Sequence, residues 1–149
     1  METPNMTYRI VPRIIALLYI LLFVYAATSK LIDFKHFRVQ LGLSPYISNL
    51  ADWIVWILPM VEYAIALLFL FPKYTIHALY ASLFVMTAFT AYLFIVLNFS
   101  DNIPCSCGGI LETLGWKAHL IFNILFMLLA LIGILMAHKV SHQNQNTTT

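Results

Sequence analysis

The two cysteines of this 149-residue chain, Cys105 and Cys107, lie one residue apart in a polar stretch between apolar segments. Thiol pairs can exchange electrons with other thiols or bind soft metals. A bridge between these two would enclose only Ser106, so it would constrain little chain entropy and would stabilise the fold very little. We therefore expect a reactive pair rather than a structural disulfide.

The local sequence allows the two sulfur atoms to meet, but under strain. A disulfide needs Cα atoms about 4.4–6.8 Å apart, whereas two extended residues span roughly 7 Å. A bend at Ser106 closes the difference, with Pro104 fixing the entry and Gly108-Gly109 giving the backbone freedom to turn. Strained bridges are oxidising and labile. His119 is a supporting candidate, because positive charge near Cys107 favours the reactive thiolate.

Three interpretations of the cysteine pair stay open at this point. Redox exchange is the leading one. The second is soft-metal binding by both thiolates with His119 as a further ligand. The third is an inert pair. Two thiolates are too few for a closed zinc site, which takes four ligands, so we predict no resident metal.

A second candidate, Glu62, lies near the middle of an apolar segment. A carboxyl group inside a membrane is costly and is a functional candidate by default. We expect Glu62 to be protonated, or paired with a hydroxyl or amide group inside the protein. A role in proton or cofactor chemistry and a purely structural hydrogen bond beside Pro59 both stay open. Asn98 and Asn123 are expected to form structural hydrogen bonds.

The elements that position these residues follow from composition. The chain is 62% hydrophobic and 9% charged, against about 25% charged residues in soluble domains. Four apolar segments, at about 10–28, 51–71, 74–99 and 119–137, each approach the roughly 20 residues that cross a bilayer. Backbone groups in lipid must be satisfied internally. The sequence therefore predicts an all-α fold, an integral membrane four-helix bundle within the lipid bilayer.

The remaining segments complete the expected organisation. Residues 1–9 form a polar N-terminal segment, 10–138 one four-span membrane domain, and 139–149 a polar disordered tail. Between the first two spans, charged and apolar residues alternate at helical spacing. This pattern predicts an amphipathic helix at the interface, ended by Gly42 and Ser44-Pro45. The net charge of +2 and the lack of any Lys/Arg run argue against a nucleic-acid partner.

Orientation cannot be read from charge alone. Four spans put both termini on one side, and the Lys and Arg residues divide evenly, four on each side, so the positive-inside rule gives a tie. Disulfides persist outside the cytoplasm. We therefore predict a multi-pass protein of the bacterial inner membrane, with cytoplasmic termini and periplasmic cysteines.

Three motifs in order resemble known membrane families. Ser29-Lys30-Leu31-Ile32-Asp33 followed by Phe37 resembles the DoxX-like family. Leu58-Pro59-Met60-Val61-Glu62 resembles the Pro-x-x-Glu pattern of the related MauE family, and Ile103-Pro104-Cys105-Ser106-Cys107-Gly108-Gly109 resembles its Cys-x-Cys signature. The resemblance covers about residues 10–137. One departure is Gly108, where family members often carry an aromatic residue.

The resemblance implies a redox-associated membrane protein in which Cys105 and Cys107 exchange electrons with a periplasmic thioredoxin-like or other thiol protein. By analogy, it would form disulfides in, or mature, a periplasmic enzyme of methylamine utilisation. Such a protein would be a thiol–disulfide oxidoreductase. The alternative is a non-catalytic assembly or metal-handling partner of a redox enzyme. Quinone would suit as an electron acceptor in the membrane, but no residue identifies a quinone site, so no cofactor is evident.

Overall fold

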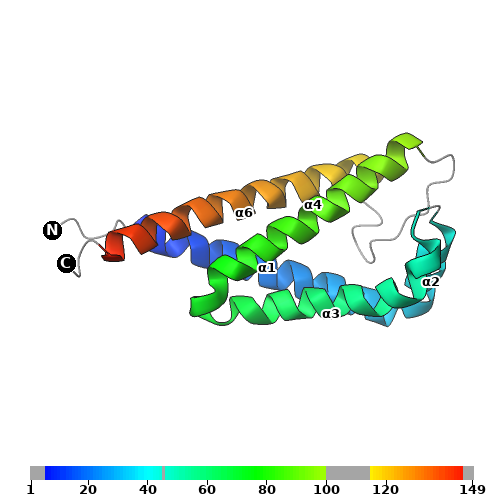
Figure 1. Cartoon of the computed structure of the whole chain (residues 1–149), viewed down its shortest axis with the longest axis horizontal. Helices are drawn as coiled ribbons and strands as arrows, with labels where there is room; N and C mark the ends of the chain where they lie inside the picture. The colour runs from blue at the N-terminus through cyan, green and yellow to red at the C-terminus, as the bar shows by residue number, and fades with distance from the viewer. Residues whose placement is uncertain (1–5, 45, 100–114, 146–149) are drawn as a thin grey trace.

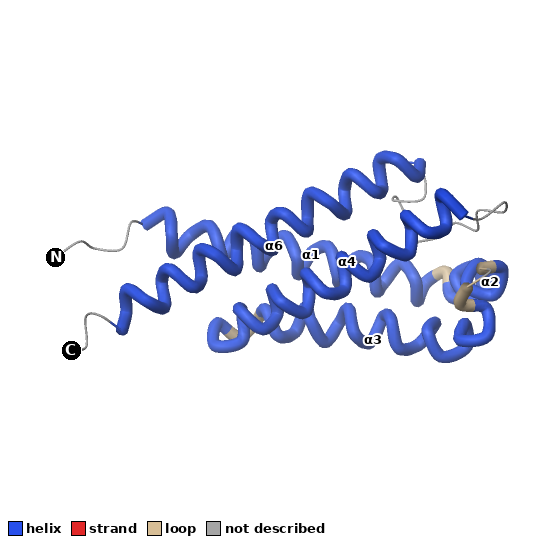
Figure 2. The backbone as a smooth tube through the Cα atoms, turned by 45° about the horizontal axis from the view of Figure 1, so that its top comes forward, coloured by secondary structure: helices blue, strands red, loops and turns tan. Residues whose placement is uncertain are grey.

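A computed structural model describes residues 6–44, 46–99 and 115–145. Four long helices run alongside one another, and a short helix caps one end of the molecule (Figure 1). Figure 2 shows that the start of α1 and the end of α6 lie together at the opposite end. The helices are α1 (Met6–Ile32), α2 (Phe34–Leu43), α3 (Ala51–Phe69), α4 (Thr75–Phe99) and α6 (Gly115–Gln145), with 3-10 turns η1 (Ser48–Leu50) and η2 (Pro72–Tyr74).

The four long helices are long and apolar enough to cross a membrane. Their membrane-compatible segments are Ile10–Ile32, Ser48–Phe69, Pro72–Ile95 and Ala118–Lys139. Many large apolar side chains point outward along them, including Leu21, Phe84 and Leu135, which a lipid environment favours and water does not. The predicted four-helix membrane bundle is confirmed.

Helix α1 packs along α3, α4 packs along α6, and contacts between α1 and α6 join the two pairs. The fully buried ring of Tyr19 lies at this junction. Its ring centroid is 5.7 Å from that of Phe69 on α3 and 5.3 Å from that of Phe126 on α6. The hydroxyl of Tyr19 donates a hydrogen bond to the backbone carbonyl of Phe126. One side chain of α1 therefore connects three helices.

The predicted interfacial helix is present as α2. It buries Phe37 and ends at Leu43, next to the predicted stop signals. On its outer face, Arg38 Nη2 lies 2.7 Å from Asp52 Oδ1, at the start of α3. The indole side chain of Trp53, one residue further on, is exposed, as expected for an aromatic residue at a membrane interface.

The first span is longer than predicted. It was expected to end near residue 28, but α1 continues to Ile32 and leads almost directly into α2. The amide of Asp33 donates to the carbonyl of Ser29 at 3.1 Å, and the amide of Phe37 donates to the carbonyl of Asp33 at 3.0 Å. The charged residues after Thr28 do not stop the helix because Lys30 points into the protein interior, where it is 3% exposed.

The two ends of the chain are also more helical than predicted. Helix α1 begins at Met6, within the polar segment 1–9, and α6 continues to Gln145. The prediction of a disordered tail over 139–149 is therefore wrong for residues 139–145, and residues 146–149 lie outside the described part. Extending an existing helix costs far less than nucleating one, so polar residues can continue α6 beyond its apolar span.

Candidate functional site

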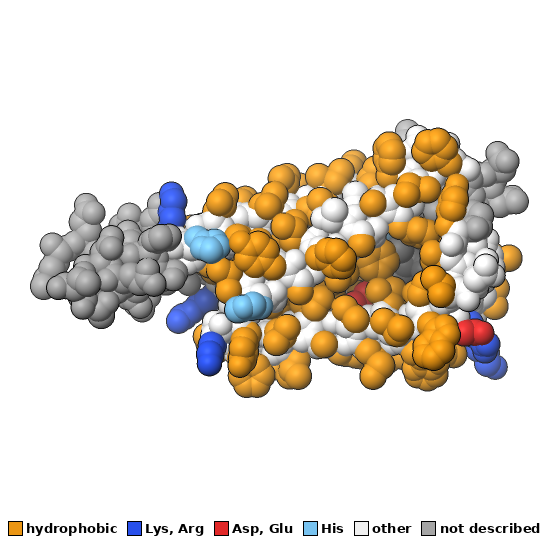
Figure 3. Space-filling view, viewed as in Figure 1, with side chains coloured by type: hydrophobic (Ala, Val, Ile, Leu, Met, Phe, Trp, Pro, Cys, Tyr) orange, Lys and Arg blue, Asp and Glu red, His pale blue; other side chains and the backbone are white. Residues whose placement is uncertain are grey.

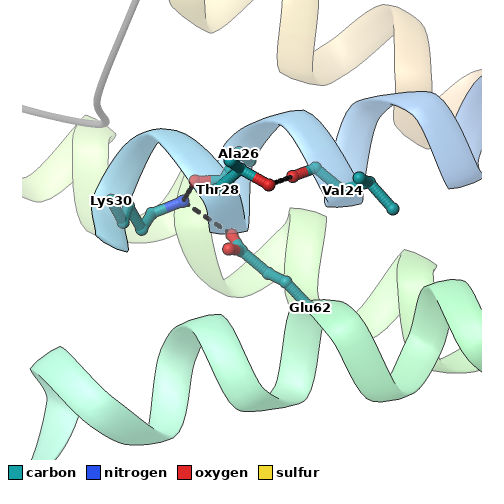
Figure 4. Close-up of polar contacts among 5 residues, drawn as sticks. All are labelled: Val24, Ala26, Thr28, Lys30 and Glu62. Atoms are coloured by element: carbon teal, nitrogen blue, oxygen red, sulfur yellow. Dashed lines mark hydrogen bonds and ion pairs between the residues drawn. The ribbon is translucent and has the colours of Figure 1, made fainter. Parts of the chain in front are cut away.

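The interior of the bundle holds a buried ion pair between Lys30 of α1 and Glu62 of α3. Lys30 Nζ lies 2.7 Å from Glu62 Oε1, and both side chains are 3% exposed. The ammonium group also donates to the backbone carbonyl of Ala26 at 3.3 Å. Figure 4 shows the two side chains reaching toward each other across the gap between α1 and α3.

This pairing corrects the expected partner of Glu62. We expected a protonated carboxyl group, or one paired with a hydroxyl or amide. Instead its partner is the ammonium group of Lys30. A carboxylate and an ammonium group that share a hydrogen bond offset each other's desolvation cost, which neither could bear alone in a low-dielectric interior.

Helical periodicity explains why both side chains face inward. On α1, the buried residues Tyr19, Phe23, Ala26 and Lys30 recur every three or four positions, which places them on one helix face. On α3, Glu62 belongs to an equivalent buried set with Val55, Pro59, Ala66 and Phe69. Because α1 and α3 pack along each other, the two charged residues within these faces meet.

One polar atom of the pair lacks a partner. Among the buried side-chain oxygen and nitrogen atoms of the described residues, Glu62 Oε2 is the one that lacks a hydrogen-bond partner. Lys30 has three N–H groups, and the two bonds above account for two of them. Its Nζ also lies 6.0 Å from the ring centroids of Phe37 and Phe89, within the range of cation–π attraction.

The pair forms part of the lining of a pocket between α1, α3, α4 and α6, with a cavity volume of about 40 Å³. Figure 3 shows a hollow among apolar side chains on this face, with an acidic side chain inside it, and the acidic residue of the pocket lining is Glu62. Two further polar residues line the pocket, His119 and Asn123 of α6, and both are buried. The apolar part of the lining is Leu22, Phe23, Ala26, Met86, Phe89 and Phe122.

Two of the predicted site residues therefore come together, since Glu62 and His119 line one pocket. The other candidates, Pro104, Cys105, Cys107 and Gly108-Gly109, lie outside the described residues. Their predicted roles, and the predicted influence of His119 on Cys107, stay predictions.

The asparagines behave differently from each other. Asn98 donates to the carbonyl of Phe94 at 2.8 Å, within α4, so its predicted structural hydrogen bond is confirmed. Asn123 is buried and faces the pocket. Among the described residues, no group of three or more His, Cys, Asp or Glu side chains could hold a metal ion.

Sequence reasoning missed Lys30 as a site residue, because it assigned this lysine to the interfacial segment after the first span. A signal was present. A carboxylate inside an apolar span needs a charged or polar partner, and Lys30 continues the spacing of the inward-facing residues of α1 by four positions from Ala26. If the first helix had been predicted one turn longer, Lys30 would have been expected on the inward face and as the partner of Glu62.

These features define a four-helix integral membrane protein with a buried ion pair and a small pocket in its interior, lined by both polar and apolar side chains. Residues 8–136 match the family model described as methylamine utilisation protein MauE, and the chain belongs to this family. The match includes the ion pair, the pocket and the cysteine segment. No curated protein matches the chain, and no solved structure does.

Proposed function

We propose that this member of the MauE family is a membrane thiol–disulfide redox protein. Its Cys105–Ser106–Cys107 motif would exchange electrons with a periplasmic thioredoxin-like or other thiol protein, and the product would be disulfide formation or maturation in a periplasmic enzyme. Methylamine utilisation is the pathway that the family description suggests. The observation that carries the proposal is the closely spaced pair itself, since these are the only two cysteines of the sequence.

The proposed exchange uses two displacements at sulfur. A thiolate of the pair attacks the disulfide of the partner, which forms a mixed disulfide and releases one partner thiolate. The second cysteine then attacks the mixed disulfide. The Cys105–Cys107 bridge forms, and the partner leaves as a dithiol with both electrons. In the reverse direction, the bridge is donated to a reduced partner.

The surrounding fold supports such a role. In the sequence, the cysteine segment connects the end of α4 to the start of α6. Both of these helices are part of the packed bundle. These two helix ends lie at the same end of the molecule as α2 (Figure 1), where Arg38 of α2 pairs with Asp52 of α3. Charged side chains at this end suit contact with a water-soluble partner.

Trapping of the mixed disulfide tests the proposal. In cells expressing Cys105→Ala or Cys107→Ala, one of the two variants should accumulate a covalent complex, because the resolving thiol is missing. The complex should dissociate with reductant, and mass spectrometry should identify a thiol protein. Ser106→Ala, which keeps both thiols, serves as the matched control and should not accumulate the complex.

The double variant Cys105→Ala/Cys107→Ala separates the two functions considered for this chain. In the redox function it forms no mixed disulfide and loses activity. If the double variant still binds the same partner and supports full maturation of the enzyme, the chain acts as a non-catalytic assembly partner, and the redox proposal is wrong.

A further inference from the structure

The unpartnered oxygen of Glu62 is the feature that the proposed thiol chemistry does not use. An unsatisfied acceptor in the protein interior costs about 1–3 kcal/mol, and more when it is charged. Native proteins pair such atoms with protein groups or with ordered water. Glu62 Oε2 has no donor among the described residues, and Glu62 lines a pocket in the bundle. A donor from outside the protein would therefore satisfy it.

The volume and polarity of the pocket decide which donor fits. A water molecule needs about 10–15 Å³ of cavity and two to four polar partners, whereas the cavity that binds a benzene molecule measures about 150 Å³. The pocket has about 40 Å³, which has room for about three or four water molecules but not for an aromatic ring. Lys30, His119 and Asn123 contribute the remaining polar groups to its lining.

We propose that this pocket is an intramembrane proton-exchange site, in which ordered water binds Glu62 Oε2 and carries protons to and from the carboxyl group. In the exchange, hydronium gives a proton to the carboxylate, which leaves neutral Glu62 and one water molecule, and the reverse step restores the ion pair with Lys30. The inference concerns residues other than the cysteines and is independent of the proposed thiol exchange.

The charged and titratable neighbours of Glu62 fit this role. Helix α1 presents Lys30, which donates to carboxylate Oε1, whereas Oε2 has no partner among the described residues. Helix α6 presents His119, which is buried in the same lining. Helix α4 presents Met86 and Phe89, neither of which can titrate, so proton exchange on this side of the pocket depends on water.

The pocket lies in the half of the bundle nearer α2. Lys30 is in the last turn of α1, and His119 is close to the start of α6, so both lie toward that end of the molecule. The hollow in Figure 3 occupies the same half. The α2 end is therefore the nearer end of the molecule, and in this proposal protons exchange with the solution on that side of the membrane.

Cysteine accessibility tests whether the pocket is wet. In a background with Cys105→Ser and Cys107→Ser, Asn123→Cys places a thiol in the pocket lining, and Ala130→Cys places one at a fully buried position of α6 outside it. The probe is aqueous silver ion, applied to the full chain in lipid nanodiscs. Because thiol reactivity follows exposure to solvent, Asn123→Cys should react at least about 10-fold faster than Ala130→Cys.

A substitution that fills the pocket tests whether the silver reaction takes place inside it. Ala26→Val adds two methyl groups at the lining, whereas Ala27→Val adds them at a buried neighbour outside it. Only Ala26→Val should slow the silver reaction at Asn123→Cys. Circular dichroism and a monodisperse elution profile confirm that each variant folds. Equal reaction rates at Asn123→Cys and Ala130→Cys would mean a dry pocket and would overturn the proposal.

Infrared spectroscopy tests the proton step on the native ion pair. A difference spectrum between acidic and alkaline solution should contain a carboxyl band that is lost in Glu62→Gln and that shifts rapidly in D₂O. Lys30 and both cysteines stay in place in this experiment. A band that is absent from the wild type, or that fails to shift in D₂O, would show that Glu62 does not exchange protons with water.

Discussion

At the scale of single residues, the buried ion pair of Lys30 and Glu62 has one member that the sequence reveals and one that only the structure reveals. Glu62 stands out in the sequence because an acid within an apolar span is rare. Its partner Lys30 does not stand out, because a lysine near the end of a span can lie at the membrane interface as well as in the protein interior. The position of Lys30 depends on where α1 ends and on which face α3 covers, and both are tertiary properties. The cysteine pair was recognisable from spacing alone, but it lies outside the described residues.

The first prediction concerns Lys30→Met. The substitution keeps much of the side-chain volume but removes the ammonium group, so the carboxyl group of Glu62 loses its charge partner at Oε1. Breaking one side of a buried ion pair destabilises a protein by about 3 kcal/mol or more. Thermal or denaturant unfolding in detergent, followed by circular dichroism, should show this loss.

The double variant Lys30→Met/Glu62→Met is the matched control. It removes both charges together, and well-packed apolar replacements of buried pairs are often neutral or stabilising. Most of the lost stability should therefore return. If Lys30→Met is as stable as the wild type, or if the double variant is worse than either single change, the pair does not act as a coupled unit.

At the scale of elements, the helices were predictable and their contacts were not. Four apolar stretches of span length leave few alternatives to a helical bundle, because lipid cannot satisfy backbone groups. The charged and apolar alternation after the first span was sufficient to predict α2. Helix ends were the weak point, as at Thr28 and at residue 139, because polar residues can be buried by a neighbouring helix or can continue a helix that already exists.

The role of Tyr19 as a connection between helices gives the second prediction. Tyr19→Phe removes the hydroxyl that donates to the carbonyl of Phe126 but keeps the stacked ring. Interhelical hydrogen bonds in membrane proteins are worth about 0.6 kcal/mol on average. We expect a loss of that order in the free energy of unfolding. Tyr19→Ala, which also removes the ring, should cost several times more, and equal effects of the two changes would contradict the assigned role of the ring.

Two glycines give the third prediction, because their surroundings differ. At Gly133 of α6, an added Cβ would lie 3.1 Å from Leu79 Cδ2 and 3.5 Å from Ile15 Cδ1. Gly133→Leu should therefore force α6 away from α1 and α4 and destabilise the bundle by about 1–3 kcal/mol, as overpacked cores do. Unfolding midpoints of the purified variants measure the effect.

The matched comparison is Gly42→Ala in α2, where no atom lies within 4 Å of an added Cβ. Alanine favours a helix over glycine by about 0.5–1 kcal/mol, so this change should leave stability unchanged or raise it slightly. A larger loss at Gly42 than at Gly133 would mean that α2 has a close neighbour and that the α6 contact is loose.

At the scale of the whole molecule, the structure changes the argument about orientation. The eight Lys and Arg residues divided evenly between the two sides when Lys30 counted as a loop residue. Lys30 is buried and paired with Glu62, so it cannot act as a topological signal in a loop. Four basic residues then remain on the side of the termini and three on the side of α2. This difference of one residue is in the direction of the predicted cytoplasmic termini.

The fourth prediction is that Cys105 and Cys107 lie on the periplasmic side of the membrane. After treatment with a permeable reductant, a membrane-impermeant thiol reagent should label the wild-type chain in intact cells. The double variant Cys105→Ala/Cys107→Ala should take no label, because the sequence contains no other cysteine. A single cysteine introduced in place of Lys73, in the connection between α3 and α4, should react only after lysis.

The reverse pattern, with the residue-73 cysteine labelled in intact cells and the native pair labelled only after lysis, would place the pair in the cytoplasm. In that reducing compartment disulfides are rare and usually transient, so a periplasmic partner would no longer be accessible to the pair.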